Sequence, residues 1–247
     1  VVGESGAGKS MLGKAILGIL PRDMTPTHGR ILLNGEDLLR LSARARRNLL
    51  KRDLALIPQD PMSALNPCRK ISAHVGEVLR AAGVEDVDRE VVRRLDAVRI
   101  PSAVRVAKSY PHELSGGMRQ RVLIAAAFAG RPKLVIADEP TTALDVTVQK
   151  EVLRLIRQLQ RDTGVGLLFI THDLCVVAKI CANVIVMQGG RIVESARAEA
   201  LLSAPQHPYT RALMAATPRH DLPHQNLTPV PAELIASMLA ELRSSDG

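Results

Sequence analysis

Short apolar runs alternate with amphipathic segments along most of the chain. Several runs have the length of buried strands and end at a proline, a glycine or a polar residue. These runs are Val1–Val2, His28–Asn34, Leu54–Ile57, Leu134–Glu139, Gly166–Thr171 and the pair Val184–Met187 and Arg191–Glu194, which flanks Gly189-Gly190 as a hairpin. Helical spacing covers residues 10–20, 40–52, 71–100 with a break at Gly83, 116–129 and 146–161. The alternation predicts an α/β fold, a mostly parallel sheet with helices on both faces.

The composition changes near residue 205, after which proline, histidine and polar residues dominate. We therefore predict a main domain over residues 1–204 and an extension over residues 205–247 that lies outside the main core. The mostly helical stretch over about residues 66–128 is expected to form a sub-domain of the main domain.

Composition narrows the choice of partner. Of the 247 residues, 46% are hydrophobic, which is enough for one large domain with a buried core. The formal net charge of +8 favours an anionic partner. Nucleic acid is not expected, because only 2% of the residues are aromatic and few rings can stack on bases. The dense basic run Arg44–Arg52 is interpreted as a solvated helix face.

The cysteines and the lengths of the apolar runs indicate a cytosolic location. The three cysteines include no C-x-x-C pair, as in proteins with reduced thiols. No apolar run approaches the about 20 residues that span a bilayer.

The segment Gly3-Glu4-Ser5-Gly6-Ala7-Gly8-Lys9-Ser10 fits the phosphate-binding pattern G-x-x-x-x-G-K-[ST]. Its glycines let the backbone turn tightly around an anion, and the start of the following helix attracts negative charge. Lys9 is suited to the β- and γ-phosphates of a nucleotide, and the Ser10 hydroxyl is suited to Mg²⁺. The simpler interpretation is a glycine-rich turn before a helix.

Asp138 and Glu139 end an apolar strand, at the edge of the sheet where ligands bind in α/β folds. Asp138 is placed to hold Mg²⁺, directly or through water. Glu139 is placed to polarise a water molecule for attack on the γ-phosphate. Alternatively, the two acids only mark the point where the strand meets solvent.

Ser115, Gly116 and Gly117 form a second amide-rich helix start that attracts anions. The alternative is an ordinary serine N-cap. Because the chain already contains a complete phosphate loop, a second phosphate-binding element requires a second nucleotide or a second copy of the protein.

Together these motifs resemble the ATPase subunit of ABC transporters. The phosphate loop, Gln59, LSGGMRQR, LVIADEP, Ala143-Leu144-Asp145 and Ile170-Thr171-His172-Asp173 follow the order and approximate spacing of that family up to about residue 205. The resemblance implies a P-loop NTPase fold of the ABC type. It also implies two ATPase subunits paired head to tail, with each ATP between the phosphate loop of one and the Leu-Ser-Gly-Gly segment of the other.

The resemblance also implies roles for single residues. Gln59 is expected to sense Mg²⁺ and the attacking water, and His172 to hydrogen-bond the γ-phosphate and keep Glu139 and the water in register. Ser115, Gly116 and Gly117 are expected to contact the partner's ATP, and Asp145 to reach across the dimer. As alternatives, Gln59 and His172 are polar strand ends and Asp145 is a helix N-cap.

The C-terminal part resembles one subfamily. The segments Ile57–Pro67 and Pro205–Leu213 (PQHPYTRAL) are similar to those of oligopeptide, dipeptide and nickel importer ATPases. The alternative for the second segment is a proline-punctuated surface turn. Residues 214–247 contain no cysteine, which excludes an iron–sulfur site there. The family also has strands and an adenine-stacking aromatic residue before the phosphate loop, so the sequence is interpreted as truncated at its N-terminus.

We therefore predict an ATP- and Mg²⁺-dependent motor subunit of an importer, located peripherally at the cytoplasmic face of the inner membrane. The implied partners are a second ATPase subunit, identical or homologous, two membrane permeases and an extracytoplasmic solute-binding protein. The expected solutes are peptides. The alternatives are an importer for nickel or another solute, an inactive truncated fragment, and a soluble ABC ATPase acting on ribosomes or DNA.

Overall fold

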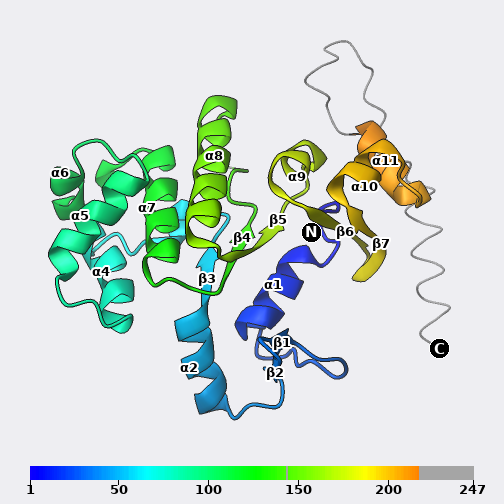
Figure 1. Cartoon of the computed structure of the whole chain (residues 1–247), viewed down its shortest axis with the longest axis horizontal. Helices are drawn as coiled ribbons and strands as arrows, with labels where there is room; N and C mark the ends of the chain where they lie inside the picture. The colour runs from blue at the N-terminus through cyan, green and yellow to red at the C-terminus, as the bar shows by residue number, and fades with distance from the viewer. Residues whose placement is uncertain (143, 217–247) are drawn as a thin grey trace. The chain divides into compact units, whose positions relative to one another are not determined.

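The computed structural model describes residues 1–142 and 144–216. It divides into two compact units, coloured along the chain in Figure 1. The N/C unit contains Val1–Leu12 and the described residues from Phe169 onward, and the middle unit is Gly13–Leu168. The boundaries lie within helix α1 (Lys9–Leu17) and strand β5 (Gly166–Ile170). The predicted division between residues 204 and 205 stays a prediction.

The middle unit is built around parallel strands. Strand β3 (Leu54–Ile57) pairs in parallel with β4 (Leu134–Asp138), and the strand order is β3-β4-β5. The register places Ile57 opposite Ala137, so both strands end at the same edge. Two features of these strands were predicted from the sequence: the apolar runs themselves and the polar residues that follow them.

Helices α4 to α7 gather into one body in Figure 1. Helix α7 packs against α3, α4, α5, α8 and strand β3, which explains why it is apolar on most of its surface. Gly83, with a φ of +76°, ends α4 as predicted. The helices of this unit are α2 (Ala43–Asp53), α3 (Pro61–Ala64), α4 (Ile71–Ala81), α5 (Val87–Ala97), α6 (Ala103–Lys108), the 3₁₀ helix η1 (Pro111–Glu113), α7 (Gly116–Ala129) and α8 (Val146–Thr163).

The basic run is a largely solvated helix face, as expected, but its last residue has a structural role. Asp53 at the end of α2 is buried and accepts hydrogen bonds from the Arg52 guanidinium at 2.8 and 2.9 Å. Lys133 lies 3.2 Å from the same carboxylate. The hydrogen bonds from Arg52, and more weakly the neighbouring Lys133, lower the pKa of Asp53 despite its burial. The ion pairs therefore join α2 to the segment that leads into β4.

In the N/C unit the first residues of the chain lie between two strands. Val2 forms parallel bridges with Thr171 on one side and Val186 of strand β6 (Asn183–Gln188) on the other. The Val2 N–H donates to the Ile185 carbonyl at 2.8 Å, and the Thr171 N–H donates to the Val1 carbonyl at 3.1 Å. The expectation that Val1 and Val2 end a buried strand at the phosphate loop is confirmed, because both are buried and paired.

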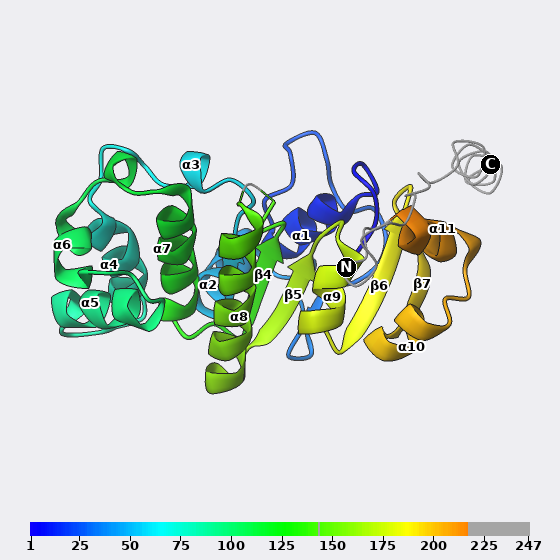
Figure 2. The ribbon, with the colours of Figure 1, turned by 90° about the horizontal axis from the view of Figure 1, so that it is seen from above.

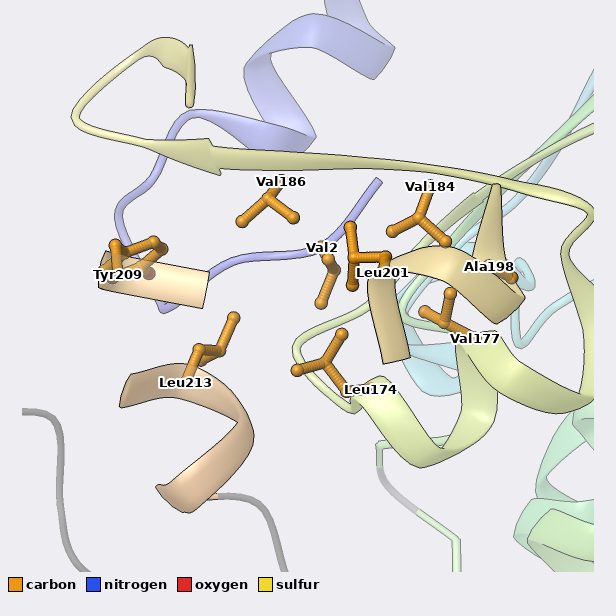
Figure 3. Packing of buried hydrophobic residues seen from close by; sticks show 9 residues of the cluster. All are labelled: Val2, Leu174, Val177, Val184, Val186, Ala198, Leu201, Tyr209 and Leu213. Atoms are coloured by element: carbon orange, nitrogen blue, oxygen red, sulfur yellow. The ribbon is translucent and has the colours of Figure 1, made fainter. Parts of the chain in front are cut away.

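The β6–β7 hairpin organises the rest of this unit. Strand β7 (Arg191–Arg197) pairs antiparallel with β6, as predicted from Gly189-Gly190. Helices α9 (Leu174–Ile180), α10 (Ala198–Ser203) and α11 (Pro208–Ala216) accompany the hairpin, and Figure 2 shows α10 and α11 beside it. A buried apolar cluster joins these elements to Val2 (Figure 3): Val2, Leu174, Val177, Val184, Val186, Ala198, Leu201, Tyr209 and Leu213.

The expectation that the chain beyond Pro205 lies outside the main core is wrong for α11. Tyr209 is fully buried and Leu213 is 5% exposed within the cluster. Of the described residues after 204, the polar and proline-containing ones form the turn before α11, whereas apolar side chains of the helix complete the core of the unit. Residues 217–247, including the rest of the cysteine-free tail, lie outside the described residues.

Two further boundaries differ from the prediction. Helix α1 ends at Leu17 and not at Pro21, because Gly18 adopts a φ of +66° and ends the helix. The predicted strand over residues 28–34 shortens to β1 (Leu32–Leu33), which pairs with β2 (Glu36–Asp37). The Asn34-Gly35 turn between them is as expected, with φ values of +52° and +84°. Among the described residues, helices of membrane-spanning length and apolarity are absent.

Candidate functional site

The phosphate loop wraps around the side chain of Lys9. The Lys9 ammonium donates to the carbonyl oxygens of Gly3 and Glu4, both at 2.8 Å, and the residue is only 4% exposed. The Ala7 N–H also donates to the Glu4 carbonyl, at 3.2 Å. Burying an ammonium costs free energy, which an arriving polyphosphate would offset. A turn with only a structural role would not need this charge.

Three glycines of the loop are required for different reasons. A Cβ on Gly3 would lie 2.2 Å from the Met187 carbonyl oxygen, so the first glycine permits close packing on β6. Gly6 and Gly8 have φ values of +85° and +92°, which other residues rarely adopt. A Cβ on Gly6 would meet no atom within 4 Å, so backbone conformation alone requires a glycine there.

Supports for the loop come from segments that the sequence motifs do not include. The Gly190 N–H in the β6–β7 turn donates to the Ala7 carbonyl at 3.1 Å. The Glu4 N–H donates to the Tyr209 hydroxyl of α11 at 3.1 Å. From the sequence we predicted the hairpin and identified the segment that contains His207-Pro208-Tyr209-Thr210 (the HPYT segment), but no pattern connected either of them to the loop.

His172 follows the C-terminal end of β5 within the N/C unit. Thr171 and Val2 are bridged in parallel, so His172 and Gly3 leave adjacent strands at the same sheet edge. His172 is exposed, and the Thr171 hydroxyl accepts the Asp173 N–H at 3.0 Å to shape the turn after it. The structure thus brings His172 to the sheet edge at which the phosphate loop begins.

The acidic residues lie in the middle unit, at the edge where β3 and β4 end. The Gln59 amide Nε2 donates to Glu139 Oε2 at 3.3 Å, and the Thr142 hydroxyl donates to the same oxygen at 3.0 Å. Glu139 has a φ of +44°, a strained conformation for a residue with a side chain. Asp138, the last residue of β4, is half-buried beside it. Gln59 and Glu139 are therefore in contact although 80 residues separate them.

The Ser115 and Asp145 side chains are helix N-caps, also in the middle unit. Ser115 Oγ accepts the Met118 N–H at 3.3 Å at the start of α7. Asp145 Oδ1 accepts the N–H groups of Thr147 and Val148, at 3.1 and 3.0 Å, at the start of α8. The capping interpretation of both residues is confirmed, and it leaves room for a further role because both are exposed. Ala143, of the Ala-Leu-Asp motif, lies outside the described residues.

The two glycines after Ser115 have different surroundings. A Cβ on Gly117 would lie 2.8 Å from Val148 Cγ1, so Gly117 lets the start of α7 pack against α8. A Cβ on Gly116 would meet no atom within 4 Å, and Gly116 is exposed. Packing against the described residues therefore explains Gly117 but does not explain Gly116.

The candidate residues fall into two groups, one on each unit. The phosphate loop, with Ser10, and His172 belong to the N/C unit, whereas Gln59, Asp138, Glu139, Ser115–Gly117 and Asp145 belong to the middle unit. Oxygen atoms are the ligands that Mg²⁺ takes in proteins, and each group contains some: the Ser10 hydroxyl in the N/C unit, and the Asp138 carboxylate and the Gln59 amide oxygen in the middle unit. Among the described residues no three His, Cys, Asp or Glu side chains cluster as a metal site. The remaining ligands of such a cation would be water or phosphate oxygens.

Comparison with known families decides what this set of residues belongs to. Residues 1–142 match the family model described as "ABC transporter". The chain belongs to the ABC transporter ATPase family. Residues 193–240 also match "Oligopeptide/dipeptide transporter, C-terminal region". The resemblance expected from the motifs and from the HPYT segment is therefore confirmed.

Curated relatives align with most of this ABC ATPase. The dipeptide transport ATP-binding protein DppD of Bacillus subtilis (strain 168) is 44% identical over 234 residues, which are 93% of this chain and 70% of DppD. The oligopeptide transport ATP-binding protein OppD of Salmonella typhimurium is 44% identical over 238 residues, which are 94% of this chain and 70% of OppD.

A solved structure confirms the fold class. The cbiO1 protein of Clostridium perfringens, part of the ABC transporter complex cbiONQ, matches with a TM-score of 0.70 at 28% identity. The match covers 82% of this chain and 78% of cbiO1. The predicted P-loop NTPase fold of the ABC type, with a mostly parallel sheet and a helical region, is therefore correct.

Proposed function

We propose that this ABC ATPase binds ATP at the phosphate loop and hydrolyses it to drive the import of peptides. The observation that carries the proposal is the presence of two glycine-led phosphate-binding elements in one chain. One surrounds the buried Lys9 ammonium in the N/C unit. The other is exposed at the start of α7, where packing against the described residues does not explain Gly116.

Each residue of the phosphate loop has a distinct part in ATP binding. The backbone of residues 3–8 is expected to surround the phosphates, with Gly6 and Gly8 supplying the conformations that turn N–H groups inward. Lys9 would contribute its charge to the β- and γ-phosphates, and the Ser10 hydroxyl would ligate Mg²⁺. Asp138 and the amide oxygen of Gln59 are proposed as further ligands of Mg²⁺.

Hydrolysis is assigned to Glu139. Its carboxylate accepts hydrogen bonds from Gln59 and Thr142 at one oxygen, which orients the group. Such a carboxylate can remove a proton as a water molecule attacks the γ-phosphate. His172, at the sheet edge that begins the phosphate loop, is expected to hydrogen-bond the γ-phosphate.

The second glycine-led element implies a second ATPase subunit. Ser115 and Gly116 are exposed at the N-terminus of a 14-residue helix, a position that favours a phosphate. On the neighbouring start of α8, Asp145 is exposed and Val146 is 55% exposed. Exposed apolar and polar groups of this kind suit contact with another protein surface. We infer that these residues meet the ATP and the phosphate loop of an identical or homologous subunit.

The transported solute is inferred from the relatives. DppD and OppD are named as dipeptide and oligopeptide transport ATP-binding proteins, and the C-terminal family model carries the same description. We therefore place this chain at the cytoplasmic face of the inner membrane, bound to two permease subunits that receive peptide from a solute-binding protein. The 205–247 extension is proposed to be specific to this importer type.

Alanine at Gly116 and at Gly117 is expected to have different effects. Gly116→Ala should leave the free energy of unfolding unchanged and lower ATP turnover at least tenfold, because the new methyl group faces the site of the partner's phosphate. Gly117→Ala should destabilise the chain by about 1–3 kcal/mol, because its Cβ would overlap Val148. Chemical denaturation and phosphate release measure the two effects.

Val148→Ala is the matched control for this pair. Combined with Gly117→Ala, it should recover stability, since it removes the atom that the new Cβ would meet. Combined with Gly116→Ala, it should recover no activity. Full ATP turnover by a folded Gly116→Ala variant would contradict the role of α7 in a composite ATP site.

Uptake by cells tests the transport function. Cells lacking the gene should lose uptake of a radiolabelled dipeptide and keep uptake of radioactive nickel, and the unmutated gene should restore the loss. A Glu139→Gln gene should not restore it. Loss of nickel uptake would favour the metal-importer alternative, and co-sedimentation of the ATPase with ribosomes at unchanged dipeptide uptake would favour a non-transport role.

A further inference from the structure

The HPYT segment is attached to the β6–β7 hairpin by its backbone. Glu194 of β7 accepts the Gln206 N–H at Oε1 and the His207 N–H at Oε2, at 2.9 and 3.0 Å. Both oxygens of one carboxylate thus hold the turn that precedes α11. These two hydrogen bonds therefore fix the turn before α11 to strand β7 of the same unit.

Residues of the segment also determine how α11 begins. His207 Nδ1 accepts the Tyr209 N–H at 3.2 Å, as an N-cap side chain does. Pro208 is the first residue of the helix, where its missing N–H is not needed and its fixed φ suits a helix. His207 and Pro208 therefore start the helix so that the next side chain, Tyr209, points into the unit.

The Tyr209 side chain belongs to the apolar cluster, and its hydroxyl reaches the phosphate loop. In Figure 3 the chain runs from Val2 past Tyr209 toward α1. The ring is fully buried, and the hydroxyl accepts the Glu4 N–H at 3.1 Å. Burial raises the pKa of Tyr209, so the phenol stays neutral at physiological pH.

Glu4, which donates its N–H to the Tyr209 hydroxyl, also contacts Lys9 and Ala7 within the phosphate loop. Its N–H is held by Tyr209, while its carbonyl oxygen accepts both the Lys9 ammonium at 2.8 Å and the Ala7 N–H at 3.2 Å. Through its N–H and its carbonyl group, Glu4 therefore connects α11 to Lys9, the lysine proposed to bind the phosphates. A shift of Glu4 would move one of the carbonyl groups that fix the Lys9 side chain.

We propose that Tyr209 is a positioning residue for phosphate binding: its hydroxyl fixes Glu4, and Glu4 in turn fixes Lys9 in the loop. The inference rests on the proposed binding of ATP at this loop. It assigns the HPYT segment, which sequence comparison relates to transporters of one type, a physical role in the ATP site. The C-terminal part of the chain thereby contributes to nucleotide affinity without touching the nucleotide.

Tyr209→Phe in the full chain removes the hydroxyl and keeps the buried ring. We expect the Kd values for ATP and for inorganic tripolyphosphate to rise together by about five- to tenfold, as for the loss of one hydrogen bond of about 1 kcal/mol. The KM for ATP should rise by a similar factor, with a smaller change in kcat. Without nucleotide, hydrogen exchange of the Glu4 amide should become faster at least fivefold.

Tyr110→Phe is the matched control, since it makes the same chemical change at the other tyrosine of the chain, in the middle unit. It should alter none of these quantities. Leu213→Ala is the control for stability, because it leaves a cavity in the same cluster and should lower the unfolding temperature without changing the Kd. Should Tyr209→Phe fail to fold, Glu194→Gln weakens the anchor of α11 and should give the same changes at reduced size.

Two results would overturn the inference. One is unchanged Glu4 exchange and unchanged Kd in a folded Tyr209→Phe variant. The other is an equal loss of affinity in Leu213→Ala, which would mean that the effect follows stability and not position. Failure of the unmutated chain to bind ATP would instead contradict the proposed function, while faster Glu4 exchange in Tyr209→Phe would still support the contact with the loop.

Discussion

Replacing Glu139 by glutamine is expected to lower ATP turnover by about a hundredfold to ten-thousandfold, the usual contribution of a general base. Glutamine keeps the shape of the side chain and can still accept hydrogen bonds from Gln59 and Thr142, so the strained backbone at Glu139 should persist. ATP binding should remain, because the phosphate loop lies elsewhere in the chain. The variant should accumulate as an ATP-bound dimer, measured by phosphate release and light scattering.

Glu151→Gln is the control for this prediction. Glu151 lies on α8, is half-exposed and pairs with Arg121 at 2.6 Å, so the same change there removes a carboxylate to which no part in hydrolysis is assigned. Its ATP turnover should stay within about twofold of the unmutated chain, as is usual for a surface ion pair. Undiminished turnover in Glu139→Gln would rule out Glu139 as the base.

Replacing Lys9 by methionine is expected to weaken ATP binding at least a hundredfold. The ammonium would make charge-assisted hydrogen bonds to phosphate oxygens, each worth about 1.5–3 kcal/mol, and about 2.8 kcal/mol corresponds to a hundredfold change in Kd. Methionine fills the space of the buried stem. Without nucleotide, we expect the free energy of unfolding to change by less than about 1 kcal/mol, because desolvation of the ammonium offsets its bonds to Gly3 and Glu4.

Lys14→Met provides the comparison, since Lys14 is an exposed lysine further along the same helix. It should leave the Kd for ATP within about threefold, as expected for a screened surface charge. Isothermal titration calorimetry measures both affinities, and thermal unfolding measures both stabilities. Tight ATP binding by Lys9→Met would exclude the phosphate loop as the nucleotide site.

Several local features of the backbone could be predicted from short stretches of the sequence. The phosphate loop, the Ser115 cap and the Asn34-Gly35 turn depend on a few consecutive residues with defined backbone conformations. Such features can be inferred whenever the local pattern is strong. The contact between Gln59 and Glu139 was not predicted, and it arises because two parallel strands end at one edge.

Other features were predicted wrongly or were missed. The composition after residue 205 is typical of a solvated segment, yet Tyr209 and Leu213 are buried. Glycines 116 and 117 look equivalent in the sequence, but only Gly117 lies against Val148. In both cases the outcome depends on which side chain of a distant segment fills the adjacent space.

The sequence by itself predicted the nucleotide chemistry proposed for this ABC ATPase, because the residues expected to carry it are adjacent in the chain or follow buried strands. Only the tertiary structure decided what supports that chemistry. The Glu4 N–H and the Tyr209 hydroxyl are 205 residues apart, and their contact arises from the packing of α11 into the apolar cluster. No local pattern specifies such a contact, since it depends on the packing of elements that are distant in the chain.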